Sequence, residues 1–418
     1  MSIIIEEIDL QYDVYDITVD DNHNFYANDI LVHNCLEITL PTKPFINTIE
    51  DGYTTEYIIT KDEKAKAKIE KLVSTYNFLP RKYEGKLFKR IENVDQIKDN
   101  IGNVIHVNVQ DKTDAEMALC ILAAINLGNV ENLYDGRFEK MIYSTVRALD
   151  NLIDDQEYPV RAAEISAKMR RTLGVGVTNF AYYLAKRGIR YSDGSANKAT
   201  HELFEAFQYY LIKASVALAK ERGACEWFDQ TKYAKGILPI DTYHKGLDEA
   251  IGKFDYKLDW EALRADVLKY GMRHSTLSAQ MPVESSSKTT SSTNGIEIPK
   301  ELYSVKDGVP FVVPEINELF ANYETMWEQP SMTGYMNIVG IMQKFMDQAI
   351  SGNTFYDPSR YGGKVPLKNI IKDIIYGYRI GWKTMYYHYT NDDDKKEDTK
   401  DLPSGGDDDG EDCESCKI

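Results

Sequence analysis

The sequence lacks any apolar run long enough to cross a membrane, and its beginning lacks the basic segment of a signal peptide. A membrane-spanning helix needs about 20 predominantly apolar residues, and no uninterrupted stretch of this chain approaches that length. The chain starts with Met-Ser-Ile-Ile-Ile-Glu-Glu, which is acidic where a signal peptide is basic. We therefore expect a cytoplasmic protein without membrane contact.

Positive charge is also scarce, because 49 Lys and Arg residues face 66 Asp and Glu residues and the net charge is −17. Surfaces that bind nucleic acid carry the opposite sign, so we expect no nucleic-acid partner. Residues 391–418 alone hold 12 acidic residues and four lysines, with almost no apolar residue. Such a composition predicts a disordered, flexible acidic tail.

Cysteine is rare as well, with five residues in 418, which excludes a disulfide framework in a cytosolic chain. Each cysteine is therefore considered as a reactive group. Cys413 and Cys416 have the spacing of zinc ligands but no second pair of ligands nearby, so we predict no metal site. The chain has no P-loop, and Gly174-Val175-Gly176 lacks the third glycine of a dinucleotide fingerprint.

The sequence does contain short apolar runs that alternate with long amphipathic stretches between residues 35 and 390. Residues 118–125 are typical of a buried strand, whereas residues 198–222 and 261–270 have helical periodicity. This alternation predicts an α/β layer or barrel fold. Residues 48–110 have a different texture, and we interpret them as a surface insertion.

Residues 1–34 form a short, strand-rich zone, with strands expected at 14–19 and 30–32, that runs into the triplet His33-Asn34-Cys35. An asparagine side-chain amide can attack its own main-chain carbonyl and cut the chain after itself. A neighbouring histidine can polarise that carbonyl, and a following thiol can hold the acyl chain. The triplet supplies these groups in order, although alone it is also compatible with an ordinary turn after a strand.

Two sequence blocks around this triplet resemble the C-terminal blocks of protein-splicing elements. The resemblance implies that Asn34 cyclises, His33 assists, Cys35 acts as nucleophile, and Asp16 and His23 tune proton transfer. Residues 1–34 would then be a small all-β, C-terminal split-intein fragment, and an upstream chain would carry the N-terminal intein half. The blocks are Val14-Tyr15-Asp16-Ile17-Thr18-Val19 with His23-Asn24-Phe25-Tyr26-Ala27-Asn28, and Ile30-Leu31-Val32-His33-Asn34-Cys35.

From Cys35 onward, a series of motifs resembles the large (α) subunit of class I ribonucleotide reductase. The resemblance implies that residues 35–390 are part of a ten-stranded α/β barrel. It also implies radical-dependent reduction of ribonucleoside diphosphates to 2′-deoxyribonucleoside diphosphates for DNA synthesis. The motifs follow the family order: Cys35-Leu36-Glu37-Ile38, Ala118-Leu119-Cys120, Arg170-Arg171-Thr172-Leu173-Gly174, Pro282-Val283-Glu284-Ser285-Ser286, Thr293-Asn294-Gly295-Ile296-Glu297, Tyr356-Asp357-Pro358-Ser359-Arg360, Lys383-Thr384-Met385-Tyr386-Tyr387 and Cys413-Glu414-Ser415-Cys416.

Cys35 and Glu37 fit the first step of such a reaction. A thiyl radical can abstract the ribose 3′-hydrogen while a carboxylate takes the 3′-hydroxyl proton. Residues i and i+2 of a strand share one face, so both side chains can address one sugar. By the resemblance, Cys35 is the thiyl residue and Glu37 is the general base, although an isolated Cys-x-Glu pair would carry no such meaning.

The other cysteines fit the supply of electrons. Reduction consumes two electrons, which a dithiol provides by becoming a disulfide. The resemblance assigns Cys120 to the active-site pair, whose other member lies upstream of this chain. Cys120 alone, in an apolar segment, would be interpreted as an inert core thiol. Cys413 and Cys416 on the acidic tail would re-reduce the disulfide and be recharged by thioredoxin or glutaredoxin, and Cys225 is expected to be structural.

Two further motifs receive roles from the resemblance. Tyr386 and Tyr387 would carry an oxidising equivalent from a di-metal small (β) subunit to Cys35, although in a chain with 29 tyrosines such a pair is usually packing. A Ser-rich turn would hold the substrate diphosphate through hydroxyls and amides, with a plain helix N-cap as the alternative. Its residues are Pro282, Val283, Glu284, Ser285 and Ser286.

These expectations combine into a split-gene precursor in which Cys35 serves first in splicing and then as the thiyl residue. We expect no cofactor bound by this chain, a homodimer of the spliced subunit, and nucleoside triphosphate effectors bound by the upstream half. One alternative is a splicing element on a host that is no longer active as a reductase. Another is a glycyl-radical reductase, which would need a glycine-centred loop in place of the two C-terminal cysteines.

Overall fold

The computed structural model describes residues 116–391, apart from 159–160 and 307–308, and short backbone pieces nearer the beginning of the chain. Apart from residue 67, these pieces are strands. Their bounds are β1 Asn24–Ala27, β2 Ile30–His33, β3 Pro41–Lys43, β4 Tyr53–Thr60, β5 Lys89–Ile91 and β6 Asn103–Gln110.

The first two strands form an antiparallel hairpin, in which Asn24 pairs with His33 and Ala27 pairs with Ile30. Strand β2 confirms the strand predicted at residues 30–32, whereas the one predicted at 14–19 lies outside the described residues. Strands β4, β5 and β6 form a separate antiparallel sheet in the order β5-β4-β6.

Strand β3 pairs antiparallel with β7 (Glu116–Met117), with Pro41 opposite Met117 and Lys43 opposite Glu116. The chain therefore leaves this pairing after residue 43 and returns to it at residue 116. The interpretation of residues 48–110 as a surface insertion stays a prediction.

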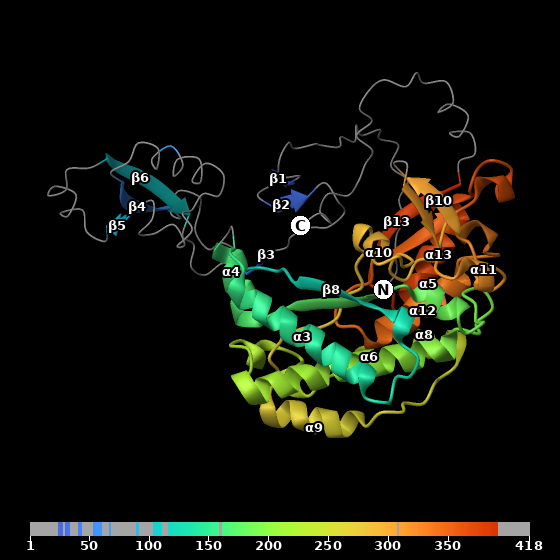
Figure 1. Ribbon diagram of the computed structural model, residues 1–418, viewed down its shortest axis with the longest axis horizontal. Helices are drawn as coiled ribbons and strands as arrows, with labels where there is room; N and C mark the ends of the chain where they lie inside the picture. The colour runs from blue at the N-terminus through green and yellow to red at the C-terminus, as the bar shows by residue number, and fades with distance from the viewer. Residues whose placement is uncertain are drawn as a thin grey trace, which may run out of the picture.

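Parallel strand segments follow one another in chain order and make an arc (Figure 1). Strand β8 (Ile121–Asn126) pairs with β9 (Leu173–Thr178) from Ile121 opposite Leu173 to Asn126 opposite Thr178. A bridge from Val175 to Ser278 adds the segment around residues 276–281, and a bridge from Gln280 to Ile350 continues the arc. Strands β12 (Gly352–Tyr356) and β13 (Met385–Thr390) complete it.

The arc confirms the α/β fold class but corrects the expected shape, since the described residues form an open arc rather than a closed barrel. A parallel strand needs a partner on each side to satisfy its backbone groups, and the described segments supply such partners for only part of a ring. The complete ten-stranded barrel stays a prediction.

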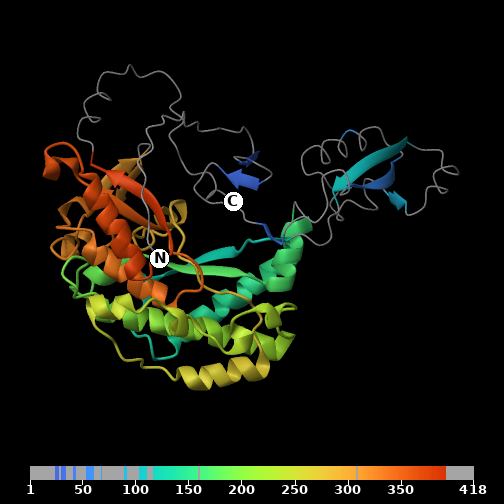
Figure 2. The ribbon, with the colours of Figure 1, turned by 180° about the vertical axis from the view of Figure 1, so that it is seen from behind.

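Helix α6 (Asn197–Arg222) is the centre of the helical layer and packs against α3, α9 and α12. Figures 1 and 2 show α3, α6 and α9 stacked on one side of β8 and β9. The helices predicted at residues 198–222 and 261–270 are confirmed. The other helices are α3 Arg137–Asp155, α4 Arg161–Arg170, α5 Phe180–Ala185, α7 Pro239–Thr242, α8 Gly246–Ile251, α9 Trp260–Tyr270, α10 Ser285–Thr289, α11 Ile316–Leu319, α12 Thr333–Phe345 and α13 Leu367–Arg379; strands β10 Tyr303–Lys306 and β11 Val309–Val312 form a hairpin.

The amphipathic pattern assigned to residues 198–222 understates the burial of α6. Its buried residues lie on several faces because three neighbouring helices cover it, and they include charged and polar side chains such as His201, Glu205 and Gln208. Glu205 is held by the N–H groups of Lys257 and Leu258, at 2.8 and 2.9 Å. The helix therefore does not expose one continuous polar face to solvent, as an amphipathic surface helix would.

A buried carboxylate, Asp150, joins the helical layer to the segment that leads into the arc. Arg171 donates to it at 2.6 Å, Arg222 at 2.7 Å and Arg273 at 3.1 Å. Burial would raise the pKa of Asp150, but hydrogen bonds and charges from His274 and Arg171 hold it below its ordinary value. Asp150 is fully buried, so its charge depends on these cations.

Candidate functional site

Cys120 lies just before β8, on the face of the arc that faces away from the helical core. In β9, Leu173, Val175 and Val177 are 0% exposed in that core, so Gly174 points to the opposite face. A Cβ atom at Gly174 would lie 3.0 Å from the Sγ atom of Cys120. Glycine therefore makes room beside this thiol, which is partly exposed.

The same face continues from Cys120 toward the Ser-rich turn. A Cβ atom at Gly176 would lie 2.6 Å from the carbonyl oxygen of Ala279 and 3.1 Å from the Sδ atom of Met281. Met281 directly precedes Pro282. The structure thus brings Cys120 and the start of the predicted diphosphate turn to one face of the arc.

Asn294 fixes the conformation of this turn. Its Oδ1 atom accepts the N–H of Val283 at 3.0 Å and the N–H of Glu284 at 2.9 Å, and its Nδ2 atom donates to the carboxylate of Glu284 at 3.2 Å. Helix α10 begins at Ser285, directly after these residues. The clamp by Asn294 therefore sets where the helix starts.

Glu284 has an unusual backbone conformation, with φ 42° and ψ −117°. A side chain in this region is strained, and such residues persist where the surrounding contacts hold them. Here the contacts are those of Asn294. A strained residue held by specific hydrogen bonds is typical of functional sites.

The end of β9 is tied to the segment that carries Asn294. Asn179 follows β9 with a left-handed φ of 69°. Its Oδ1 atom accepts the N–H of Thr293 at 3.0 Å, and its Nδ2 atom donates to Asn126 of β8 at 3.1 Å. These amide contacts place residue 294 relative to the carboxyl ends of both strands.

The tyrosine pair lies on β13. The rings of Tyr386 and Tyr387 are 4.1 Å apart between centroids, with planes inclined by 62°. Tyr386 is buried, and a third ring, Tyr389, lies 6.0 Å from that of Tyr387. The sequence-predicted pair is therefore in direct aromatic contact, with the rings closer than the usual separation of about 4.5–7 Å.

Asn353 of β12 connects β13 to the rest of the site. Its Oδ1 atom accepts the N–H of Tyr387 at 3.0 Å. Its Nδ2 atom donates to the carboxylate of Glu297 and to the hydroxyl of Tyr389, the latter at 3.4 Å. Asn353 is 2% exposed, so both ends of its amide are satisfied inside the protein.

The electrostatics of the site favour a protonated carboxyl at neutral pH. Burial and the neighbouring carboxylate of Glu284 raise the pKa of Glu297 to about 8, while Lys300 and hydrogen bonds from Asn294 and Asn353 oppose the shift. The ammonium of Lys300 stands 3.5 Å from the ring centre of Tyr389. Burial, together with Glu297 and Glu284, raises the pKa of Tyr389, so its phenol stays protonated.

Several predicted site residues lie outside the described residues. They are Asp16, His23, Asn34, Cys35, Glu37, Cys413 and Cys416, and His33 and Ser285 are described by their backbone alone. Their roles stay predictions. Cys225 is buried, and burial raises its pKa to about 11, which confirms the expectation of a structural thiol.

Sequence reasoning missed the residues that connect the motifs. Asn294 and Glu297 belong to a motif that was recognised but received no role, and Lys300, Asn353 and Tyr389 were not singled out. A signal was present at Gly295-Ile296-Glu297-Ile298, where a carboxylate interrupts an apolar run. Asn353 offered no comparable signal, because its partners come from distant segments.

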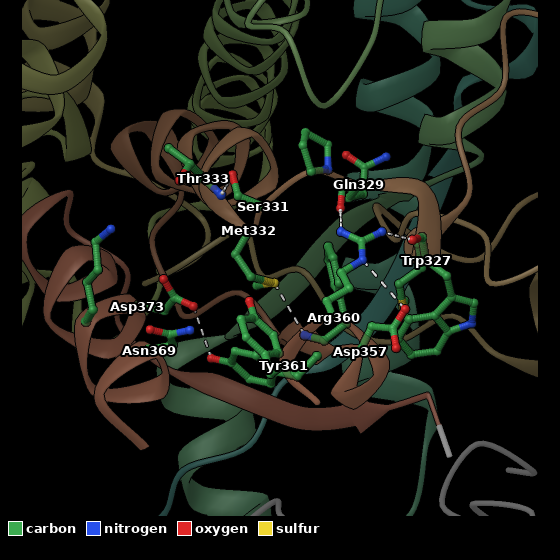
Figure 3. A pocket seen from close by; sticks show the side chains of 15 residues that line it. Trp327, Gln329, Ser331, Met332, Thr333, Asp357, Arg360, Tyr361, Asn369 and Asp373 are labelled. Atoms are coloured by element: carbon green, nitrogen blue, oxygen red, sulfur yellow. Dashed lines mark hydrogen bonds and ion pairs between the residues drawn. The ribbon is translucent and has the colours of Figure 1, made fainter. Parts of the chain in front are cut away.

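A separate cavity of about 190 Å³ lies beside the Tyr356-Asp357-Pro358-Ser359-Arg360 motif (Figure 3). Arg360 donates to the carbonyl oxygens of Trp327 and Gln329, and its Nε atom lies 3.6 Å from Asp357. Arg360 thereby ties this loop to the segment before α12. None of the sequence-predicted site residues is among the side chains that line this cavity.

The described part of the chain contains neither a cluster of metal-binding side chains nor a helix that could span a membrane. Within it, no three His, Cys, Asp or Glu side chains gather as metal ligands. None of the helices there has the length and apolar character that spanning a membrane requires.

The comparisons with known proteins agree with the motif pattern. The family model "Ribonucleotide reductase, barrel domain" matches residues 11–309 and 307–388. This match begins within the segment interpreted as an intein fragment. No comparison supports an intein, so the splicing role of residues 1–34 stays a prediction from the sequence resemblance.

Relatives with the name ribonucleoside-diphosphate reductase subunit alpha cover most of the chain. The Haemophilus influenzae protein is 54% identical over 320 residues, which are 75% of this chain and 40% of that protein. Subunit alpha of reductase 1 from Escherichia coli is 56% identical over 274 residues, 64% of this chain and 35% of the relative. The protein of Enterobacteria phage T4 is 44% identical over 322 residues, 75% and 42% respectively.

The matched part of the chain thus spans about two-fifths of the length of these relatives. The family model covers far more than half of the chain, and the described residues have the mixed α/β content and the ordered motifs expected from it. The chain belongs to the ribonucleotide reductase barrel-domain family.

Proposed function

We propose that this chain forms the catalytic part of a ribonucleoside-diphosphate reductase α subunit, which makes 2′-deoxyribonucleoside diphosphates for DNA synthesis. The observation that carries the proposal is the contact between Tyr386 and Tyr387, 4.1 Å between ring centroids, on a strand bonded through Asn353 and Glu297 to the diphosphate turn. An aromatic pair in this position suits the transfer of an oxidising equivalent toward a bound substrate.

The proposed chemistry divides among three groups of residues. Cys35 as a thiyl radical removes the 3′-hydrogen of the ribose, and Glu37 takes the 3′-hydroxyl proton. Cys120 and a cysteine of the upstream half give up two electrons and two protons and become a disulfide, while the 2′-hydroxyl leaves as water. Cys413 and Cys416 then reduce that disulfide by thiol exchange.

The Ser-rich turn is the proposed diphosphate site. Its main-chain conformation is set before any ligand arrives, because Asn294 holds the N–H groups of Val283 and Glu284. The hydroxyl groups and the amides that begin α10 offer donors to phosphate oxygens. Ser286 is exposed there, so its hydroxyl is accessible to a ligand.

The partners follow from the same proposal. A small (β) subunit with a di-metal centre supplies the oxidising equivalent to Tyr387, and thioredoxin or glutaredoxin recharges the tail dithiol. The upstream half of the α subunit supplies the second cysteine and the sites for nucleoside triphosphate effectors, and two completed α subunits form a homodimer. The chain itself binds no cofactor in this scheme.

Reductase assays test the proposal after the chain is combined with its upstream half and the small subunit. We expect Tyr386→Phe, Tyr387→Phe and Cys120→Ser to abolish reduction of ribonucleoside diphosphates while substrate binding persists. Tyr270→Phe, at the end of α9, and Cys225→Ala serve as matched controls and should keep activity. Normal turnover in Tyr386→Phe or Tyr387→Phe would show that the pair is packing alone.

We further propose that residues 1–34 are removed by protein splicing with an upstream chain. The hairpin of β1 and β2 favours this, because it pairs Asn24 with His33 and so joins the two splicing-like blocks. Mass spectrometry after coexpression with the upstream chain checks it. A ligated product in which this chain begins at Cys35 is expected, whereas an intact chain with every plausible partner argues against splicing. Ligation without any reductase activity would favour the alternative, a splicing element on an inactive host.

A further inference from the structure

A continuous run of hydrogen bonds connects the diphosphate turn to the tyrosine strand. The Oδ1 atom of Asn294 accepts the main-chain N–H groups of residues 283–284, and the carbonyl oxygen of Asn294 accepts the N–H of Glu297 at 3.0 Å. Glu297 accepts a hydrogen bond from Asn353, and Asn353 accepts the N–H of Tyr387 at 3.0 Å. The run therefore passes from the turn through residues 294–297 to β12 and then to β13.

Asn353 is the link that cannot move independently. It is 2% exposed, and its planar amide uses the oxygen toward Tyr387 and the nitrogen toward Glu297. A displacement of the Glu297 carboxyl must therefore tilt the amide or break a buried hydrogen bond, and a broken one leaves an unpaired polar group at a cost. Either response reaches the main chain of Tyr387.

Such a displacement can begin at the turn. Glu284 keeps its left-handed φ of 42° beside the contacts from Asn294. A ligand that accepts hydrogen bonds from the N–H groups of residues 283–284 competes with the Oδ1 atom of Asn294 for these donors, and so releases the Asn294 side chain.

We propose that Glu297 and Asn353 are positioning residues that couple occupation of the 282–286 turn by a diphosphate group to the position of Tyr387. This inference rests on the proposed function, because it takes the turn as the diphosphate site. It assigns Asn353 no contact with substrate. When the turn is occupied, Tyr387 then takes the position against Tyr386 in which it can pass on an oxidising equivalent.

The experiment places 3-fluorotyrosine at position 387 of the full chain and follows its ¹⁹F NMR resonance during titration with pyrophosphate. Calorimetry on the same samples measures binding separately. In the wild-type chain we expect saturating pyrophosphate to shift the resonance. In Asn353→Ala we expect affinity within about twofold of wild type, because the turn lies in a different segment, and loss of most of the shift.

Matched variants separate coupling from general damage. Glu297→Gln retains an acceptor oxygen for Asn353 and should keep the shift, whereas Glu297→Ala should lose it. Asn337→Ala removes an asparagine that bonds Tyr376 instead and should leave the shift intact. Asn353→Leu is similar in size and removes both the donor to Glu297 and the acceptor for Tyr387, so it gives the same test as Asn353→Ala if the alanine variant does not fold.

The outcomes distinguish this inference from the proposed function. Pyrophosphate that binds without moving the wild-type resonance, or a full shift in both Asn353 variants, overturns the coupling. A wild-type chain that gives no heat of binding overturns the diphosphate turn of the proposed function, and the coupling fails with it.

Discussion

The helical layer and the candidate site are stabilised by different interactions. Around α6, large apolar side chains such as Phe204, Phe207 and Leu211 are 0% exposed, and their burial follows from the hydrophobic effect with little need for particular partners. In the site, side-chain amides of Asn294 and Asn353 bind main-chain N–H groups of distant segments. The layer therefore tolerates exchange among apolar residues of similar size, whereas the site depends on individual atoms.

Asp150 is an exception within the helical layer. The stability of the layer depends on this one polar group, just as the site depends on its asparagine amides. We expect Asp150→Ala to give the largest effect, a loss of about 3–5 kcal/mol in the free energy of unfolding, since it leaves buried cations without their anion. Urea denaturation measures it. Asp154→Ala is the control, because the Asp154 side chain is 56% exposed. Equal losses in the two variants would contradict a special role of Asp150.

Glu297 gives the site a pH dependence that the apolar layer lacks. Its pKa is raised to about 8 by burial and Glu284, above the value of about 4.3 for an unfolded chain. Between pH ~4.3 and pH 8, the folded state therefore binds a proton that the unfolded chain does not. The stability linked to this proton is fully present below pH ~4.3 and is lost as the pH rises to about 8. The free energy of unfolding changes by at most ~1.4 kcal/mol per pH unit, and the partial exposure of Glu297 reduces this slope.

Glu297→Gln removes this titration. We expect the stability of the variant relative to wild type to increase steadily from pH 5 to pH 8, as measured by thermal or urea unfolding in matched buffers. A constant difference over that range would mean that Glu297 has an ordinary pKa.

The two glycines of β9 allow a finer comparison within the arc. At Gly176, a Cβ atom would lie 2.6 Å from the backbone oxygen of Ala279, which cannot move alone, so Gly176→Ala should cost about 1–3 kcal/mol. At Gly174 the nearest atom belongs to the side chain of Leu122, which is 52% exposed and can turn away. Gly174→Ala should cost less in denaturant unfolding. The reverse order would show that the segment at residue 279 is not fixed against β9.

The smallest effect is expected at the surface of the helical layer. Arg147 and Glu221 form an ion pair at 2.6 Å with side chains 38% and 44% exposed. Solvent screens such pairs, so Glu221→Gln should change the free energy of unfolding by no more than about 0.5 kcal/mol. A loss near that of Asp150→Ala would remove the distinction between buried and exposed charges.

Sequence patterns predicted the elements that depend on local periodicity. The helices at residues 197–222 and 260–270 and the strand at 121–126 were found within a few residues, because apolar spacing reports which face is buried. The motif singled out Tyr386 and Tyr387, and the structure adds the contact between their rings. The arc around residues 276–281 was not predicted, since its pairing is set by bridges to Val175 and Ile350 rather than by a strand pattern.

The hydrogen bonds that connect the residues of the site could not be predicted from the sequence, for a physical reason. A single asparagine has no periodicity, and the role of Asn353 depends on partners at positions 297 and 387 that only folding brings together. The strain at Glu284 was also hidden, because sequence signals for a positive φ are carried by glycine and asparagine.

The two hydrogen bonds between Gln280 and β9 affect how the chain folds while it is being synthesised. The side-chain amide of Gln280 accepts the N–H of Val177 at 2.8 Å and donates to its carbonyl at 2.9 Å, across 103 residues of sequence. At typical rates of translation, residue 280 follows residue 177 by about 5–20 s. During that interval one edge of β9 has no native partner from the 276–281 segment, so a chaperone or a foreign strand can reach it. That edge of β9 stays open to mispairing until residue 280 has been made.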